Sequence, residues 1–148
     1  MPHITLLYPF VPLPFFASTV PALTRLLQQC SPFETHLRQF RWFQHSSTSF
    51  TLWLRPEPEE KWQALASHLV SGFPDYRDQM AYPSGFVPHL SVGQFHGTEQ
   101  EVRTLCDQLQ QQWTPLTTTV TALFLIYRDD PPYDRFRIGA RIAMGSPA

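Results

Sequence analysis

The chain has no excess of charge. Its 148 residues include 11 Lys and Arg and 12 Asp and Glu, which gives a formal net charge of −1. Proteins that hold a long nucleic-acid duplex usually carry a basic excess, because much of their affinity comes from neutralising phosphates. We therefore expect no binding of a long duplex. A phosphate-bearing partner would be small, or a strand end held at a local site.

The chain also has few cysteines and no long hydrophobic run. No apolar run approaches the roughly 18 residues that a membrane span needs. The N-terminus lacks the basic region and the cleavage site of a signal peptide. Cys30 and Cys106 fall at apolar positions of expected helices, where free thiols in a reducing compartment are the simpler interpretation. These absences favour a cytoplasmic protein without membrane contact.

What is present is typical of one folded domain. Hydrophobic residues make up 43% of the chain and aromatic residues 14%, a composition that supports a packed core at this length. Periodicity, prolines and capping signals predict the helices and strands. The strands lie near 3–8, 33–43, 47–55, 88–95, 117–127 and 135–143, and the helices begin at Ser18 or Thr19, at Glu59, and after the capping box of Thr98 and Glu101.

The predicted elements repeat along the chain. Each strand with a Pro-His dipeptide is followed by a helix and two extended segments, and His3 and His89 lie 86 positions apart. At this offset, the apolar set Phe50, Leu52 and Leu54 corresponds to Phe136, Ile138 and Ala140. A fixed period of this kind indicates a duplicated unit. We expect one domain over residues 1–148, with halves at roughly 1–56 and 57–148 that form two similar α+β lobes about an approximate two-fold axis.

Two short stretches within the repeat share a pattern. Residues 2–9 read PHITLLYP and residues 88–95 read PHLSVGQF. Because side chains alternate along a strand, a histidine and the hydroxyl residue two places later share a face, while the aliphatic residues anchor the other face. Either motif alone is better explained as a strand histidine with satisfied hydrogen bonds. Two motifs at equivalent places of a repeat favour a functional role.

Two imidazoles and two hydroxyls in one cleft would suit in-line attack on a phosphodiester. Imidazoles titrate near neutral pH, so one histidine can act as a base while the other acts as an acid. Hydroxyl groups can donate hydrogen bonds to the non-bridging phosphate oxygens. Which histidine is the base and which is the acid stays open.

The two motifs resemble those of a known family. HITLLYPF and PHLSVGQF are similar to the tandem motifs of the two-histidine (2H) phosphoesterases, the 2′-5′ RNA ligase-like superfamily, and YPF and FVPH resemble its bacterial branch. The resemblance covers nearly the whole chain. It implies a bilobal α+β fold, with two antiparallel-rich sheets and outer helices around a central cleft. It also implies metal-independent chemistry on 2′,3′-cyclic phosphates or 2′-5′ linkages of nucleotides and RNA ends. The catalytic residues that it implies are His3, Thr5, His89 and Ser91.

Members of this family usually begin with a strand and a helix ahead of the first motif, whereas this chain starts two residues before His3. A truncated start or a minimal variant would each account for the difference. A non-catalytic module that binds a nucleotide or an RNA end is the main alternative to an enzyme. A structural protein with buried histidines fits the paired motifs less well. The direction of the reaction and the oligomeric state stay open.

Some further residues are candidates for substrate binding. Tyr8 follows the first motif and would form an aromatic shelf, or a core or rim tyrosine. Tyr127 and Arg128 end a predicted strand, where they would stack a base and contact phosphate, or form an ordinary strand end. Three arginines of the last strand are expected to share one face, as a basic wall or a solvated surface: Arg135, Arg137 and Arg141.

No cofactor is expected. The histidines of the two motifs have no carboxylate or cysteine at metal-ligand spacing, and hydroxyl side chains are poor zinc ligands. The sequence also has no phosphate-cradling glycine loop and no Ser-His-Asp signature.

Overall fold

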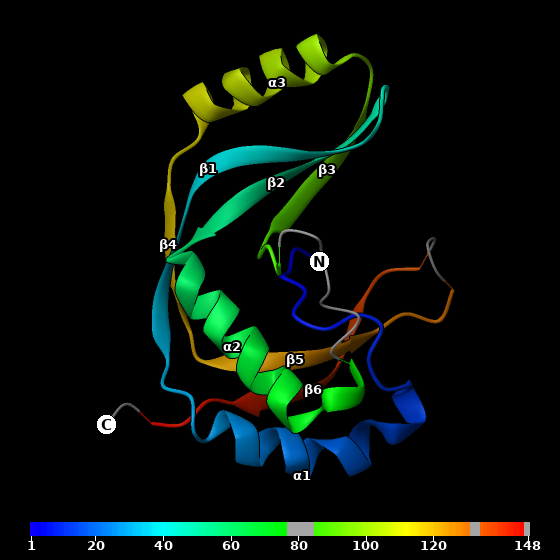
Figure 1. Ribbon diagram of the computed structural model, residues 1–148, viewed down its shortest axis with the longest axis vertical. Helices are drawn as coiled ribbons and strands as arrows, with labels where there is room; N and C mark the ends of the chain where they lie inside the picture. The colour runs from blue at the N-terminus through cyan, green and yellow to red at the C-terminus, as the bar shows by residue number, and fades with distance from the viewer. Residues whose placement is uncertain (77–84, 131–133, 147–148) are drawn as a thin grey trace.

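Two antiparallel sheets and three α-helices form the fold (Figure 1). The computed structural model describes residues 1–76, 85–130 and 134–146. The elements in chain order are η1 (Leu13–Phe15), α1 (Phe16–Leu27), β1 (Phe33–Ser46), β2 (Ser49–Glu57), α2 (Glu59–Gly72), β3 (Leu90–His96), α3 (Glu99–Gln112), β4 (Leu116–Val120), β5 (Ala122–Tyr127) and β6 (Arg137–Ala143). One sheet has the order β3-β2-β1-β4 and the other pairs β5 with β6. This confirms the predicted α+β fold with two antiparallel sheets.

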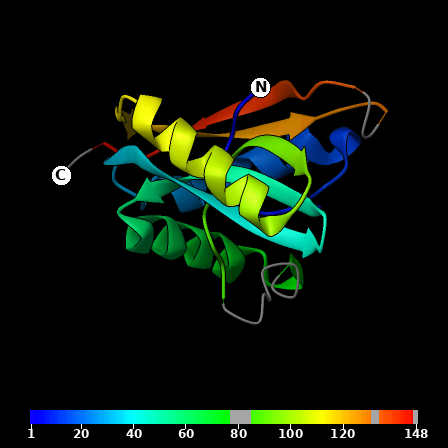
Figure 2. The same ribbon diagram turned by 90° about the horizontal axis from the view of Figure 1, so that it is seen from above.

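The upper lobe in Figure 1 is built on the face of β1 and β2 that α3 covers. Phe50, Leu52 and Leu54 of β2 are nearly inaccessible to solvent and pack with Val102 and Cys106 of α3. Figure 2, which looks down onto α3, shows the helix lying across the strands of the larger sheet. The alternation predicted for β2 therefore selects its core face correctly.

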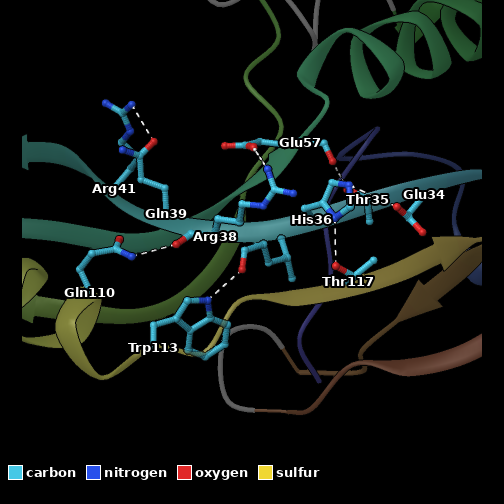
Figure 3. Close-up of polar contacts among 11 residues, drawn as sticks. Glu34, Thr35, His36, Arg38, Gln39, Arg41, Glu57, Gln110, Trp113 and Thr117 are labelled. Carbon is cyan, nitrogen blue, oxygen red and sulfur yellow. Dashed lines mark hydrogen bonds and ion pairs between the residues drawn. The ribbon is translucent and has the colours of Figure 1, made fainter.

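Hydrogen bonds to the backbone around a β-bulge in β1 hold the end of α3 against the sheet. The pairing of β1 with β2 shifts between Leu37 and Gln39, and a bulge leaves backbone groups without ladder partners. Side chains at the end of α3 take those groups up (Figure 3): the Gln110 amide donates to the Arg38 carbonyl at 2.8 Å, and the Trp113 indole donates to the Leu37 carbonyl at 2.8 Å. The Phe40 amide donates to Gln110 Oε1 at 2.9 Å. These contacts fix the position of the upper lobe's helix.

The lower lobe has its own hydrophobic core. Leu23 and Leu27 of α1 pack with Leu69 of α2 and with Leu125 and Ile142 of the β5–β6 pair. The helix that follows each predicted histidine strand thus packs against the strand pair of the other sequence half: α1 lies on β6, and α3 lies on β1. Both lobes therefore combine elements from the two halves of the chain, an exchange that the sequence repeat alone does not reveal.

The first predicted strand is much shorter than expected. Residues 3–8 form no ladder, and their only β-pairing in the described chain is an isolated antiparallel bridge between Ile4 and Leu90. Pro2 and Pro9 flank the segment, and proline has no amide hydrogen to donate to a neighbouring strand. The prediction of a full strand at 3–8 is therefore wrong, although the bridge keeps the first motif extended against β3.

The first helix begins earlier than predicted. A 3₁₀ turn at Leu13–Phe15 leads directly into α1, so Ser18 and Thr19 lie inside the helix. Their hydroxyls donate to the Phe15 carbonyl at 3.0 Å and 2.7 Å. A hydroxyl that bonds back to a carbonyl in this way is an interior helix residue and not an N-cap.

The described residues include two free thiols and no helix that could span a membrane. None of the helices in residues 1–76, 85–130 and 134–146 is long and apolar enough to cross a membrane. Cys30 and Cys106 are free thiols. Burial raises the pKa of both thiols above the ordinary value, and the neighbouring Asp107 adds to this effect at Cys106. Both therefore stay protonated at neutral pH.

The capping box predicted at Thr98 and Glu101 is present. The Thr98 hydroxyl accepts a hydrogen bond from the Glu101 amide at 3.2 Å, and Glu101 Oε2 accepts one from the Thr98 amide at 2.7 Å. We expect Thr98→Ala to lower the free energy of unfolding by about 1 kcal/mol, because the Glu101 amide at the helix end loses its acceptor. Urea denaturation measures this. Thr104→Ala, in the middle of the same helix, is the control and should have little effect.

The same box predicts a pH dependence. Hydrogen bonds from the Thr98 backbone and side chain lower the pKa of Glu101 below its ordinary value of 4.5. A carboxyl group with a lowered folded-state pKa adds stability above its unfolded-state pKa and loses that contribution as the pH falls through the lowered value. The difference in urea midpoint between wild type and Glu101→Gln should therefore be present at neutral pH and shrink in acid. A difference that does not change with pH would contradict this account.

Candidate active site

The bridge between Ile4 and Leu90 brings the two histidine motifs together. In an antiparallel pair, residues on either side of a bridged pair lie opposite each other and point to the other face. Extended by one residue in each direction, this register would set His3 beside Ser91, and Thr5 beside His89. All four predicted catalytic residues would then share one face of the paired segments.

The two histidines have the same local hydrogen bond. His3 Nδ1 lies 2.9 Å from the Met1 carbonyl oxygen, and His89 Nδ1 lies 2.8 Å from the Val87 carbonyl oxygen. A carbonyl can only accept, so the proton of each neutral ring is on Nδ1, which donates it. The Nε2 atom of each neutral ring then carries a lone pair, and neither Nε2 has a hydrogen-bond partner among the described residues. Each imidazole can accept a proton at Nε2 and, once protonated, give it back.

Each imidazole also packs edge-on against a phenylalanine. The His3 and Phe136 ring centroids are 5.1 Å apart at an interplanar angle of 75°, and those of His89 and Phe43 are 4.9 Å apart at 87°. Phe43 in turn stacks on Trp53, with centroids 4.7 Å apart. Aromatic contacts of this kind restrict the rotation of both imidazole rings. None of these three aromatic residues was predicted from the sequence to belong to the site.

Trp53 adds an unused hydrogen-bond donor next to His89. Its indole lies across from Ser91 in the β2–β3 register, and its ring centroid is 5.9 Å from that of His89. Its Nε1 is buried and has no hydrogen-bond partner among the described residues. A buried N–H without a partner is rare in folded proteins. A signal for Trp53 existed in the sequence, because it is the large apolar residue on the otherwise polar face of its strand.

The candidate binding residues fall on the His3 side of the site. The Arg128 guanidinium lies over the Phe136 ring at 4.6 Å from its centroid, so one phenylalanine contacts both Arg128 and His3. Tyr127 is half-buried and packs edge-on against Phe16. Tyr8 is 61% exposed. All three lie on the wall of one cavity, and their role in binding stays a prediction.

That cavity has a volume of about 850 Å³. His3 and Thr5 line it, whereas His89 and Ser91 are outside its wall. The two halves of the candidate site therefore border different surroundings, although their motifs match. Within residues 1–76, 85–130 and 134–146, no group of His, Cys, Asp or Glu side chains is arranged to hold a metal ion.

The shared arginine face predicted for the last strand, as a basic wall or a solvated surface, does not form. A β-bulge shifts the β5–β6 register at Gly139, so that Ile126 pairs with Ile138 and Leu125 with Ala140. Ile138 is consequently 54% exposed while Ile142 is 3% exposed, so the predicted common apolar face is wrong. A side chain at Gly139 would lie 2.6 Å from the Phe16 ring, which explains the glycine.

The arginines of this strand are separated by the same bulge. Arg137 pairs with Tyr127, whereas Arg141 pairs with Phe124 on the other side of the shift. Arg137 forms ion pairs with Asp129 at 2.6 Å and Asp134 at 3.2 Å. The hydrogen bond to Asp129 and the charge of Asp134 raise the pKa of Arg137, whereas the hydrogen bond from the Asp129 backbone amide is the main cause that lowers the pKa of Asp134. The ion pairs join Asp129, just after β5, and Asp134 to the first residue of β6.

Three of the remaining histidines have structural partners, and His96 is exposed. His36 Nδ1 contacts Thr117 Oγ1 at 2.9 Å and its Nε2 lies 3.4 Å from Glu34 (Figure 3). His45 contacts Thr51, and His68 donates to the Leu26 carbonyl.

Comparisons with known proteins place the chain in a family. A family model described as the 2′-5′ RNA ligase superfamily matches residues 1–132. Among solved structures, the crystal structure of TT0787 of Thermus thermophilus has a TM-score of 0.66 at 17% identity, covering 98% of this chain and 79% of that one. At this identity, the likeness shows the fold alone. No curated protein gives a significant match. Because the family model spans most of its residues, the chain belongs to the 2′-5′ RNA ligase superfamily.

Proposed function

We propose that the protein is a phosphoesterase that needs no metal and acts on 2′,3′-cyclic phosphates or 2′-5′ phosphodiesters of nucleotides or RNA ends. The observation that supports this most directly is the antiparallel pairing of the two motifs, with Nε2 free on both histidine rings. Membership of the 2′-5′ RNA ligase superfamily supports a phosphoesterase-type reaction. The proposed catalytic residues are His3, Thr5, His89 and Ser91.

The proposed reaction uses the two Nε2 atoms in turn. One neutral imidazole takes a proton from water as the water oxygen bonds to phosphorus. The other, protonated, imidazole gives its proton to the ribose oxygen as the phosphorus–oxygen ester bond breaks. The carbonyl at each Nδ1 stabilises the positive charge that its ring carries when protonated. Thr5 and Ser91 donate hydrogen bonds to the non-bridging oxygens.

The experiment that tests this function is hydrolysis of 2′,3′-cyclic nucleotides by the purified protein with EDTA present, followed by product analysis. Turnover that persists in EDTA is the expected result. Saturable nucleotide binding without turnover by folded protein would contradict the proposal and identify a binding module instead. Product analysis also shows whether the 2′ or the 3′ ester is opened.

Substitution of Phe136 tests whether its ring positions His3. Phe136→Leu removes the ring that packs against His3 and supports Arg128. We expect kcat to fall by up to about 10²-fold, because small displacements of a reacting group are costly. KM should change much less than kcat. Steady-state kinetics measure both values, and Phe15→Leu, at a ring that is 58% exposed, is the matched control. A change confined to KM would contradict a positioning role.

A further inference from the structure

The cavity beside His3 extends into the core of the lower lobe. Its wall includes Leu23, Leu27 and Leu69, which are at most 5% exposed. The N-terminal segment 1–13 forms another part of the wall. The cavity thus connects a candidate catalytic histidine with the most apolar part of the molecule.

Polar groups of the wall meet where Phe136 touches both His3 and Arg128. Asp129 also lines the cavity, but its carboxylate is paired with Arg137. Arg128 forms no ion pair within 4.0 Å among the described residues, although its charge contributes to the lowered pKa of Asp134. A phosphate at this place would have Arg128, His3 and Thr5 as its neighbours.

The cavity of about 850 Å³ is open to solvent, since exposed residues such as Tyr8 stand on its wall together with the buried leucines. Water is held poorly by walls that offer it few hydrogen bonds. Cavities of roughly 300–1,000 Å³ with apolar walls and a few polar groups are typical of small-ligand sites. Phe124 and Ile138, also on the wall, are 47% and 54% exposed. Both features indicate an apolar ligand.

The surroundings of His89 differ in polarity. The register of β1 with β2 pairs Arg41 with Trp53 and Gln39 with Arg55, so these side chains share the face of the sheet that also carries Ser91. A polar or charged group suits this side. The two equivalent motifs are therefore flanked by a sheet face with aromatic and polar side chains on one side and an apolar cavity on the other.

We propose that the cavity binds the apolar part of a phosphate ester whose phosphate lies at His3, Thr5 and Arg128. The inference rests on the proposed function for the position of the phosphate. A nucleotide or another polar part of the same ligand lies on the His89 side. Such a ligand is a phosphate ester with one polar and one apolar substituent, a class that the site accepts in addition to the nucleotides of the proposed function.

Binding of alkyl phosphates tests the inference. Inorganic phosphate and butyl, hexyl and octyl phosphate are titrated calorimetrically into the full chain. Each added methylene should tighten binding about fourfold, which corresponds to about 0.8 kcal/mol per buried methylene. Arg128→Gln should weaken all four ligands by a similar factor and leave the dependence on chain length unchanged.

Two alanines provide a matched pair of cavity variants. Ala122 lies on the wall, and Ala143, its register partner on β6, does not. Ala122→Phe should abolish the increase in affinity with longer alkyl chains, whereas Ala143→Phe should retain it. Thr121→Trp, at an exposed position of the wall, is a second filling variant if Ala122→Phe does not fold.

The outcomes separate this inference from the proposed function. Binding that does not depend on chain length overturns the cavity inference, even if cyclic nucleotides are hydrolysed. Chain-length dependence without hydrolysis supports the cavity and overturns the proposed function. If the affinity depends on alkyl chain length equally in Ala122→Phe and Ala143→Phe, the ligands bind outside the cavity. If the protein forms a dimer that does not bind the ligands, a second copy fills the cavity. Both of these results overturn the inference.

Discussion

His89→Ala and His3→Ala should each lower kcat/KM for hydrolysis of a 2′,3′-cyclic nucleotide by about 10²–10⁴-fold, the usual contribution of a general acid or base. Each substitution removes one of the two Nε2 atoms that the proposed reaction needs. The double variant should be less impaired than the product of the single losses, because residues that act as a unit are not additive. Initial rates in EDTA measure all three variants.

The controls for this experiment come from the same chain. His96→Ala changes an exposed histidine on β3, the strand that begins next to His89, and should retain activity. Circular dichroism and urea denaturation check that every variant is folded. Near-wild-type rates in His3→Ala would contradict a two-histidine reaction and would leave His89 as the sole proton-transfer residue.

The sequence predicts the site in part because the histidine motifs combine residue type with strand periodicity. Alternation along an extended segment puts His3 with Thr5, and His89 with Ser91, whatever the rest of the fold does. The position of one motif beside the other cannot be predicted in this way, because it depends on one bridge between segments far apart in the chain. No local pattern specifies that pairing. The repeat only suggested it.

The aromatic residues around the histidines could not be found in the same way. Phe43 and Phe136 come from β1 and from the segment before β6, and each meets a histidine that is far away in the sequence. The 86-residue repeat aligns Phe136 with Phe50, which is fully buried in the upper core. The residue that matches Phe136 by its contact with a histidine is Phe43. Packing in three dimensions, and not the sequence offset, decides this correspondence.

The faces of β6 are predicted wrongly because its backbone contains a β-bulge. The alternation of β6 fails because a single bulged residue, Gly139, moves Ile138 to the opposite face of the strand. A bulge adds one residue to one strand only, so every side chain beyond it changes side. Glycine was the only local sign, and its significance depends on Phe16, which packs against it from α1.

Phe50→Ala should lower the free energy of unfolding by about 3–5 kcal/mol, as large-to-small changes of a buried phenylalanine typically do. Phe50 is 0% exposed at the centre of the upper core, so the cavity left behind has no access to solvent. This loss is a large fraction of the roughly 5–15 kcal/mol that stabilises a typical domain. Phe15→Ala, which truncates a ring that is 58% exposed, should cost less than about 1 kcal/mol.

Urea denaturation of both variants also tests whether the two lobes unfold together. The chain has two separate cores, but β1 belongs to both: Phe33 packs against the lower core, while Leu37 and Phe40 are buried in the upper one. Loss of the upper core should therefore also release the β1 residues that complete the lower core. We expect Phe50→Ala to shift one cooperative transition to lower urea concentration. Two separated transitions would show that β1 does not couple the lobes, and that the lobe carrying His3 remains folded by itself.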